Sequence, residues 1–138
     1  MRRKSTLALF VCLGLGTLPA LAGPTPNEPV LNFALLDHRG RMHELRRLDA
    51  SVVVMFFTAN ECPVARQCAA KLRDVQERFS ARGVSVLLVN ASSGDDRKSI
   101  GKEARELGIW HLPTLKDDTQ GVARHLGVRR TGETIAIS

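Results

Sequence analysis

Residues 51–72 read SVVVMFFTANECPVARQCAAKL, and this stretch decides the fold. The unbroken apolar run over 52–57 predicts a buried strand. A short loop follows over 58–61, and Cys62 then stands directly before Pro63. Proline is favoured at the first helical position because the N–H that it lacks has no partner there anyway. The sequence therefore predicts a helix that begins at Pro63 and has Cys62 at its N-cap.

A cysteine at the N-cap of a helix is placed to react as a thiolate. Free backbone N–H groups and the positive end of the helix dipole both stabilise the thiolate relative to the thiol. We therefore expect the pKa of Cys62 to lie below the value of about 8.5 that a free cysteine has. The shift should be modest because Glu61 is the preceding residue and carries a negative charge. Strand, loop, Cys-Pro and helix are typical of a thiol redox centre; the plainer interpretation of Cys62 is a small buried residue.

Neither of the other cysteines is placed to form a disulfide with Cys62. Cys68 follows it by six residues, which along a helix is a rise of about 9 Å and a rotation of about 240°. A disulfide needs two Cα atoms within about 7 Å of each other. Cys12 lies in a segment that we expect to be removed. We therefore expect no intramolecular disulfide, and we interpret Cys68 as a packing residue on the apolar stripe of the helix.

The first 22 residues have the pattern of a secretory signal peptide. Three basic residues at 2–4 precede an apolar run over 7–18, and Ala-Leu-Ala at 20–22 forms a small-x-small cleavage signal. The apolar run is too short to span a bilayer. We therefore expect a signal peptide at 1–22 and a Pro-rich linker at 23–29. The mature protein is expected to be periplasmic or secreted, with no membrane attachment after cleavage.

The mature chain is expected to carry little net charge. The whole sequence has 20 basic and 14 acidic residues, a net charge of +6, and three of the basic residues lie in the predicted signal peptide. The other 17 basic residues are interspersed with the 14 acidic ones, which leaves +3. No basic stripe is interleaved with aromatic residues, so the sequence does not predict nucleic-acid binding. The 116 residues after the first 22 suit one domain, which we place at 30–138.

Strand and helix patterns alternate along this domain. The sequence predicts strands at 30–36, 41–45, 52–57, 84–89 and 130–137, with a short extended segment at 109–115. It predicts helices at 63–82, at 93–107 with a capping box from Ser93 to Asp96, and at 118–126. Strands that alternate with amphipathic helices are typical of an α/β domain with a largely parallel sheet.

Three segments carry a family resemblance. They read FALLDHRG at 33–40, TANECP at 58–63 and LPTLKD at 112–117. Together they resemble the thioredoxin-like fold and, more narrowly, its redoxin branch, the peroxiredoxin-like proteins of the AhpC/TSA type. The resemblance covers residues 30–137. It implies a central mixed sheet flanked by helices, with thiol-dependent redox chemistry at the Cys-Pro loop.

The sequence also departs from these relatives. Ala65 stands where thioredoxins have their second cysteine, and Ala59 stands where some peroxiredoxin-like proteins have theirs. Gly132 stands at the position that matches the cis-proline of the fold. The sequence ends at Ser138, so we expect the last hairpin strand and the C-terminal helix of the fold to be absent. The strand at 130–137 would then be an open edge, which favours self-association.

The resemblance implies roles for three residues. Cys62 is the attacking thiol. Arg130 is expected to clamp a hydroperoxide beside the thiolate, as an arginine does in peroxiredoxins, or else to be a solvated strand residue. Thr58 either donates a hydrogen bond to the thiolate or only caps the loop. It lies four residues before Cys62, whereas the threonine of true peroxiredoxins lies three before their cysteine.

The expected function is a one-cysteine redox reaction. Cys62 attacks a peroxide or a disulfide sulfur, and an external thiol reductant restores it because no second cysteine lies within reach. One alternative is a redox-silent binding module that has kept the fold and lost the chemistry. A less favoured alternative is copper handling by Cys62, His111 and His125, which is opposed by Arg66 at the position of a second cysteine in copper-handling relatives. We therefore expect no metal and no cofactor.

Overall fold

The computed structural model describes residues 29–138. The signal peptide predicted at 1–22 and the linker up to residue 28 lie outside the described residues. Within 29–138, none of the helices combines the length and the apolar character that crossing a membrane requires.

A four-stranded mixed sheet forms the centre of the domain, with its strands in the order β5, β4, β3, β6. β3 (Val52–Thr58), β4 (Val84–Asn90) and β5 (Thr114–Lys116) run parallel, and β6 (Thr134–Ile137) runs antiparallel to β3. Met55 in the middle of β3 pairs with Leu87 of β4 and with Ile135 of β6. Among the described strands, β6 pairs only with β3, so it forms an edge of the sheet as predicted.

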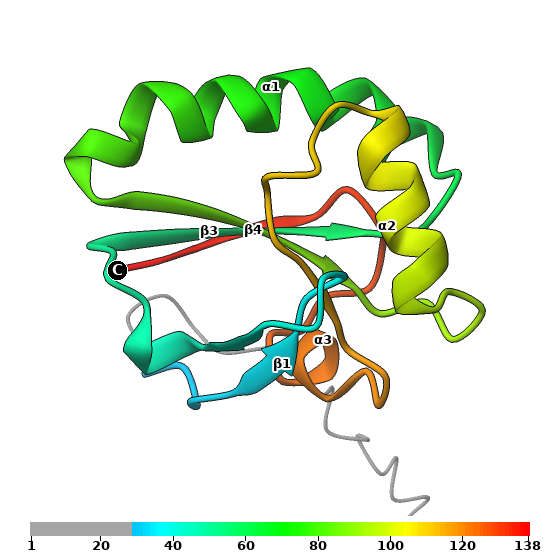
Figure 1. Cartoon of the computed structure of the whole chain (residues 1–138). Helices are drawn as coiled ribbons and strands as arrows, with labels where there is room; N and C mark the ends of the chain where they lie inside the picture. Colours follow the sequence, from blue (N-terminus) through cyan, green and yellow to red (C-terminus); the bar gives the residue numbers. More distant parts are fainter. Residues whose placement is uncertain (1–28) are drawn as a thin grey trace, which may run out of the picture.

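Helices cover both faces of this sheet (Figure 1). α1 (Pro63–Phe79) and α2 (Arg97–Glu106) lie on one face. The other face carries the short α3 (Gly121–His125) and a hairpin of β1 (Ala34–Leu36) and β2 (Met42–Glu44). Two 3-10 turns, η1 (Leu45–Arg47) and η2 (Ser80–Arg82), follow β2 and α1. The layers are those of the predicted α/β domain.

The central strand β3 contributes to the core on both faces, because successive side chains of a strand point to opposite sides. Met55 and Phe57 pack into the cluster that contains α3. Phe56 points the other way and packs into the cluster with Leu72 of α1 and Ala104 of α2. This explains why residues 52–57 are apolar without alternation, as in other parallel strands that are buried on both faces.

The structure confirms the order of the predicted elements but shortens several of them. The first strand is Ala34–Leu36 rather than 30–36, because its hairpin partner β2 ends at Glu44 and the chain turns into η1. The extended segment predicted at 109–115 begins with turns, and only Thr114–Lys116 pairs with β4. The helix predicted at 118–126 is confined to Gly121–His125 because Asp117 and Gln120 form a turn before it.

α1 was also expected to run to Gly83. It ends at Phe79, and η2 continues the chain to Gly83, which has φ +77°. A left-handed backbone of this kind is accessible to glycine at little cost. The glycine therefore ends the helical segment as predicted, after a last turn of 3-10 geometry.

The capping box predicted from Ser93 to Asp96 is wrong by three residues. Asp96 is the N-cap of α2, and its carboxylate accepts the N–H of Ser99 at 2.7 Å. The hydroxyl of Ser99 in turn accepts the N–H of Asp96 at 3.1 Å. The box is therefore formed by an aspartate followed by a serine, a reciprocal pair that satisfies two free N–H groups just as well.

The strand predicted at 130–137 is wrong in its first half. The carboxylate of Glu133 accepts the backbone N–H groups of Arg129 and Arg130 at 3.1 and 2.7 Å. Gly132 has φ +90°. These features make residues 129–133 a turn, and β6 begins only at Thr134.

Asp37 anchors the turn of the β1–β2 hairpin and is fully buried. Its carboxylate accepts the backbone N–H groups of Arg39 and Arg41 at 2.8 and 2.9 Å and the guanidinium of Arg39 at 2.9 Å. It also lies 3.0 Å from Nε2 of His43. Burial raises the pKa of Asp37, but the hydrogen bonds outweigh burial and lower the pKa from 3.8 to about 2.

Asp37→Asn should lower the free energy of unfolding by about 2 kcal/mol at neutral pH, because each pKa unit corresponds to about 1.4 kcal/mol. The pKa is lower in the folded than in the unfolded chain. The stabilisation is therefore present above about pH 4 and is lost as the pH falls towards about 2. Urea unfolding across this range should show a weaker acid dependence for the variant than for the wild type. Asp74→Asn, at an exposed carboxylate of α1, is the control; equal losses in both variants would contradict the prediction.

Candidate functional site

Cys62 is the N-cap residue of α1, as predicted. Its backbone is extended, with φ −66° and ψ 118°, and Pro63 follows as the first helical residue. The carbonyl of Cys62 accepts the N–H of Arg66 at 3.0 Å, which closes the first turn. The residue is partly buried and packs against the core on the α1 side of the sheet. The thiol therefore lies at the N-terminus of a 17-residue helix.

Thr131 is the hydrogen-bond partner of the sulfur. Its Oγ1 lies 3.2 Å from Sγ of Cys62, although the two residues are 69 positions apart. This bond lowers the pKa of Cys62, and the backbone N–H groups of Ala65 and Val64 also lower it. Partial burial and the negative charge of Glu103 raise it by less, so the net shift is downward from 9.0. Two features therefore favour the thiolate: the free backbone N–H groups at the N-cap, as predicted, and the hydrogen bond from Thr131.

The loop before Cys62 is fastened to the start of α2 through Asn60. Its backbone N–H donates to Oδ2 of Asp95 at 2.9 Å, and its side-chain amide donates to the hydroxyl of Ser99 at 3.0 Å. The same oxygen of Asp95 accepts the side-chain amide of Asn90, the fully buried last residue of β4, at 2.9 Å. Asp95 therefore joins the loop to the end of the neighbouring strand.

Glu103 of α2 holds the next residue of the loop. Both of its carboxylate oxygens accept the N–H of Glu61, at 2.9 and 3.0 Å, and one oxygen pairs with Arg66 of α1 at 3.0 Å. Glu61 has φ +59°, a left-handed backbone that is uncommon outside glycine. The contacts to Glu103 stabilise that conformation and so fix the direction in which the chain enters α1. The same contacts place the negative charge of Glu103 near Cys62, where it disfavours the thiolate.

The 129–133 turn holds Thr131 against Cys62. The N–H of Gly132 donates to the carbonyl of Phe57 in β3 at 2.7 Å. A Cβ atom at Gly132 would lie 2.9 Å from Cγ1 of Val64 in α1. The turn is therefore packed between β3 and the first turn of α1, in a conformation that requires glycine.

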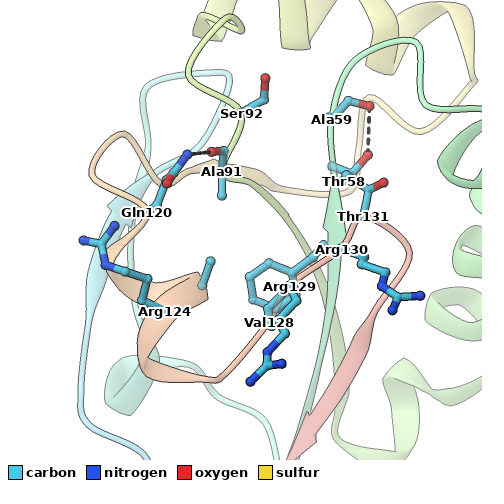
Figure 2. A pocket seen from close by; sticks show the side chains of 12 residues that line it. Thr58, Ala59, Ala91, Ser92, Gln120, Arg124, Val128, Arg129, Arg130 and Thr131 are labelled. Carbon is cyan, nitrogen blue, oxygen red and sulfur yellow. Dashed lines mark hydrogen bonds between the residues drawn. The ribbon is translucent and has the colours of Figure 1, made fainter. Parts of the chain in front are cut away.

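Thr58 and Arg130, the other two predicted site residues, both line a cavity beside Thr131 (Figure 2). The hydroxyl of Thr58 donates to the carbonyl of Ala59 at 3.4 Å rather than to the sulfur. The side chain of Arg130 extends outward from the edge of the cavity. The structure thus places both residues in the same region as Cys62. The hydrogen bond to the sulfur that was expected from Thr58 is formed by Thr131 instead.

The remaining candidates are not brought together with Cys62. Cys68 is a free, partly buried thiol that packs against the same core cluster as Phe56. Over residues 29–138, no three His, Cys, Asp or Glu side chains gather closely enough to hold a metal ion. Cys62, His111 and His125 therefore do not form the copper site considered from the sequence. His125 instead accepts the N–H of Leu31 at 3.2 Å.

Sequence reasoning missed Thr131 and Glu103. Thr131 belongs to no motif and is brought to the sulfur by the turn that replaces the first half of a predicted strand. Glu103 has the appearance of an exposed helix residue, yet its side chain is only 13% exposed because it is turned towards the Cys62 loop. One signal in the sequence pointed to Thr131. Gly132 matches the cis-proline position of the fold, which lies near the cysteine in relatives, and Thr131 is the preceding residue.

Thr131→Val should raise the pKa of Cys62, because it removes the largest contribution that favours the thiolate and keeps the shape of the side chain. Thr131→Ser should restore most of the effect, and Thr58→Val should change the pKa less than Thr131→Val does. The rate of alkylation by iodoacetamide, followed against pH, gives the pKa of each variant. A larger shift of the Cys62 pKa in Thr58→Val than in Thr131→Val would contradict the prediction, because Thr58 would then be the donor to the sulfur.

The family of the chain follows from comparisons of sequence. The AhpC/TSA family profile matches residues 26–137. The chain is 30% identical to the chloroplastic peroxiredoxin Q of Sedum lineare over 99 residues, which cover 70% of this chain and 50% of that protein. It is 34% identical to the chloroplastic peroxiredoxin Q of Oryza sativa subsp. japonica over 98 residues, 70% of this chain and 43% of that one. This chain therefore spans about half the length of the curated relatives that it matches.

Solved structures agree with this assignment. Peroxidoxin BcpB from Mycobacterium tuberculosis superposes with a TM-score of 0.64 at 28% identity, over 78% of this chain and 70% of that one. The thioredoxin domain of a thiol-disulfide oxidoreductase from Bacteroides vulgatus superposes with a TM-score of 0.72 over 83% of this chain and 82% of that one. Its 14% identity shows the fold alone. With a thioredoxin-like sheet, a cysteine at the N-cap of its first long helix and a profile match over most of its length, the chain belongs to the AhpC/TSA family.

Proposed function

We propose that this chain is an exported thiol-dependent oxidoreductase in which Cys62 is the redox-active group. The observation that carries the proposal is the hydrogen bond between Cys62 and Thr131 at the N-terminus of α1. Both features favour the thiolate, which is the nucleophilic form of cysteine. Membership of the AhpC/TSA family supports this class of reaction, and the relatives named peroxiredoxin support a peroxide as the oxidant.

In the first step the Cys62 thiolate attacks the terminal oxygen of a hydroperoxide. An S–O bond forms, the O–O bond breaks, and the departing hydroxide or alkoxide takes a proton from solvent. Cys62 becomes a sulfenic acid, while the hydroperoxide is reduced by two electrons to water or an alcohol. Thr131 acts before the attack by donating to the thiolate. We assign Thr58 and Arg130 to the substrate side of the site because both line the adjoining cavity.

In the second step an external thiol reductant restores Cys62. The thiol condenses with the sulfenic acid, water leaves, and a mixed disulfide forms. A second thiol attacks this disulfide, releases Cys62 and forms the oxidised product of the reductant. Cys68 does not replace the external thiol, since it points into the core from a position further along the same helix. A disulfide substrate enters the cycle directly at the mixed disulfide.

The place of action follows from the sequence rather than from the fold. The basic, apolar and small-residue segments of 1–22 support export to the periplasm or the cell exterior. These compartments are oxidising, and disulfides form and persist in them. Within residues 29–138 β6 pairs only with β3, and this edge supports self-association, in which a second copy would pair with that strand.

A redox-silent binding module is the second candidate. It is favoured by the alanines at positions 59 and 65, where relatives have a second cysteine, and by the charge of Glu103, which raises the pKa of Cys62. The two candidates differ in one property that can be measured. A binding module has no need of a sulfenic acid at Cys62.

Trapping of the sulfenic acid tests the proposal. After treatment with one equivalent of hydrogen peroxide, a dimedone probe should label Cys62 and leave Cys68 as a free thiol, as read by mass spectrometry of peptides. Labelling should disappear when a reduced thiol is added before the probe. Absence of label at Cys62 would favour the binding module, and a stoichiometric disulfide between the two cysteines would contradict the one-cysteine route.

A further inference from the structure

Glu103 of α2 contacts the Cys62 loop and the first turn of α1 at the same time. Both of its carboxylate oxygens accept the N–H of Glu61, at 2.9 and 3.0 Å, and Oε1 also pairs with the guanidinium of Arg66 at 3.0 Å. The side chain of Glu103 is only 13% exposed, whereas that of Arg66 is 42% exposed. The carboxylate is thus turned inward from α2, with one partner before Cys62 in the chain and one after it.

Glu61 depends on this contact because its backbone is left-handed, with φ +59°. Residues that carry a side chain rarely adopt such a backbone. Cys62 follows with φ −66° and ψ 118°, the extended geometry of an N-cap residue. The contact with Glu103 therefore maintains the backbone that presents the sulfur to the free N–H groups of Val64 and Ala65.

Arg66 is the first charged residue of α1 and lies one turn after Cys62. Its backbone N–H donates to the carbonyl of Cys62 at 3.0 Å, and residues four apart lie on the same face of a helix. A guanidinium in this position is attracted to the thiolate unless it has another partner, because its N–H groups donate strong hydrogen bonds to anions. The ion pair with Glu103 provides that other partner.

The charged side chains near the sulfur come from the elements that surround it. Glu61 lies in the loop, Arg66 in α1 and Glu103 in α2, and the negative charge of Glu103 raises the pKa of the thiol. Arg130 lies in the 129–133 turn, where its side chain extends outward (Figure 2). The pairing of Arg66 with Glu103 therefore decides how strongly a cation acts on the sulfur.

We infer that Glu103 is a positioning residue for the reaction of Cys62: it holds the loop in its left-handed turn and keeps the guanidinium of Arg66 away from the sulfur. In the proposed function, on which this inference rests, the Cys62 thiolate is the nucleophile. A thiolate that a cation stabilises strongly is abundant but attacks slowly, since the nucleophilicity of a thiolate falls as the pKa of its thiol falls. Glu103 therefore sets a balance: a smaller fraction of the thiol is ionised, and each thiolate reacts faster.

Glu103→Gln tests the effect of the charge. The amide oxygen still accepts the N–H of Glu61, but the negative charge is lost and Arg66 is released. The rate at which Cys62 reacts with dipyridyl disulfide, a neutral reagent, is followed against pH by mass spectrometry of its peptide. The midpoint of the profile should lie at lower pH than in the wild type, and the plateau rate at high pH should be about twofold lower.

Glu103→Ala tests the positioning of the loop, because it removes the hydrogen-bond acceptor as well as the charge. Its midpoint should lie above that of Glu103→Gln, since the sulfur is then less well presented to the helix N-terminus. Glu61→Gly supplies a residue that adopts a left-handed backbone at little cost. In the Glu61→Gly background the difference in midpoint between the alanine and glutamine variants should disappear.

Two further variants complete the experiment. Arg66→Gln should raise the midpoint, because the charge of Glu103 is then unopposed, and the double variant with Glu103→Gln should return close to the wild-type midpoint. Glu106→Gln is the matched control. It makes an equal change of charge on the same helix, at an exposed carboxylate that pairs with Lys102 at 3.9 Å, and it should leave the midpoint and the plateau unchanged.

The outcomes distinguish the inference from the proposed function. A wild-type midpoint in Glu103→Gln, or an equal shift in Glu106→Gln, overturns the inference and leaves the proposed function standing. Equal midpoints in Glu103→Gln and Glu103→Ala show an effect of charge alone and overturn the positioning role. If Glu103→Ala does not fold, recovery of folding by Glu61→Gly supports that role and lack of recovery overturns it. Failure of wild-type Cys62 to react with either hydrogen peroxide or the disulfide reagent overturns the proposed function itself.

Discussion

Cys62→Ser should abolish the reduction of hydroperoxides, with a loss of at least about a thousandfold relative to the wild type. A serine hydroxyl is not ionised at neutral pH, and the hydrogen bond from Thr131 cannot make it so. No other thiol in the described part of the chain is placed to substitute, because Cys68 is partly buried in α1 and packs against the core. Consumption of peroxide in the presence of excess reduced thiol measures the loss.

Cys68→Ser is the matched control for this prediction. It removes the other described thiol, keeps the size of the side chain and should retain the rate within about twofold. Its cost is in stability, about 1 kcal/mol, because a hydroxyl replaces a sulfur that packs against the core. A comparable loss of activity in both variants would show that the two cysteines act together, and retained activity in Cys62→Ser would remove the proposed site.

The parts of the site that the sequence predicts are those formed by neighbours in the chain. A strand over 52–57, a proline directly after Cys62 and an apolar stripe beyond it define β3 and the start of α1 by local rules alone. These rules involve spacings of a few residues. They predicted the N-cap position of the cysteine, which the structure confirms. They also predicted a lowered pKa, which the hydrogen bonds to the sulfur support.

The parts that the sequence does not predict depend on contacts across the fold. Thr131 is 69 residues from Cys62 and Glu103 is 42 residues from Glu61. Neither contact has a local signature, because each depends on how two elements lie relative to each other. Residues 130–133 of the turn were predicted as strand because the sequence does not reveal that Glu133 bonds back to the chain before it.

The resemblance to a family located the region but not each role. It placed Thr58 and Arg130 near the cysteine, and both line the cavity beside it. It did not identify which threonine reaches the sulfur, because the spacing from Thr58 to Cys62 is one residue longer than in true peroxiredoxins. With this longer loop, the hydroxyl of Thr58 bonds to the carbonyl of Ala59, and Thr131 forms the hydrogen bond to the sulfur.

Gly132→Ala should reduce the free energy of unfolding by about 2 kcal/mol. The backbone of Gly132 has φ +90°, which costs an alanine about 1–2 kcal/mol. A Cβ there would lie 2.9 Å from Cγ1 of Val64, so the exposed side chain of Val64 must also shift. Gly94→Ala, at a glycine in open surroundings, should change stability by less than about 0.5 kcal/mol. Urea unfolding of the two variants measures the difference.

The same substitution should also act on the chemistry, because Gly132 follows Thr131 directly. Displacement of the turn would lengthen the contact between Thr131 and Cys62 and raise the pKa of the thiol, so alkylation at neutral pH should slow. Val64→Ala in the Gly132→Ala background should remove the overlap but not the backbone cost, and should recover part of the stability together with the reactivity. If stability falls while the pKa of Cys62 stays unchanged, the N-terminus of α1 alone stabilises the thiolate. The turn would then be a structural support of the sheet, with no part in tuning the cysteine.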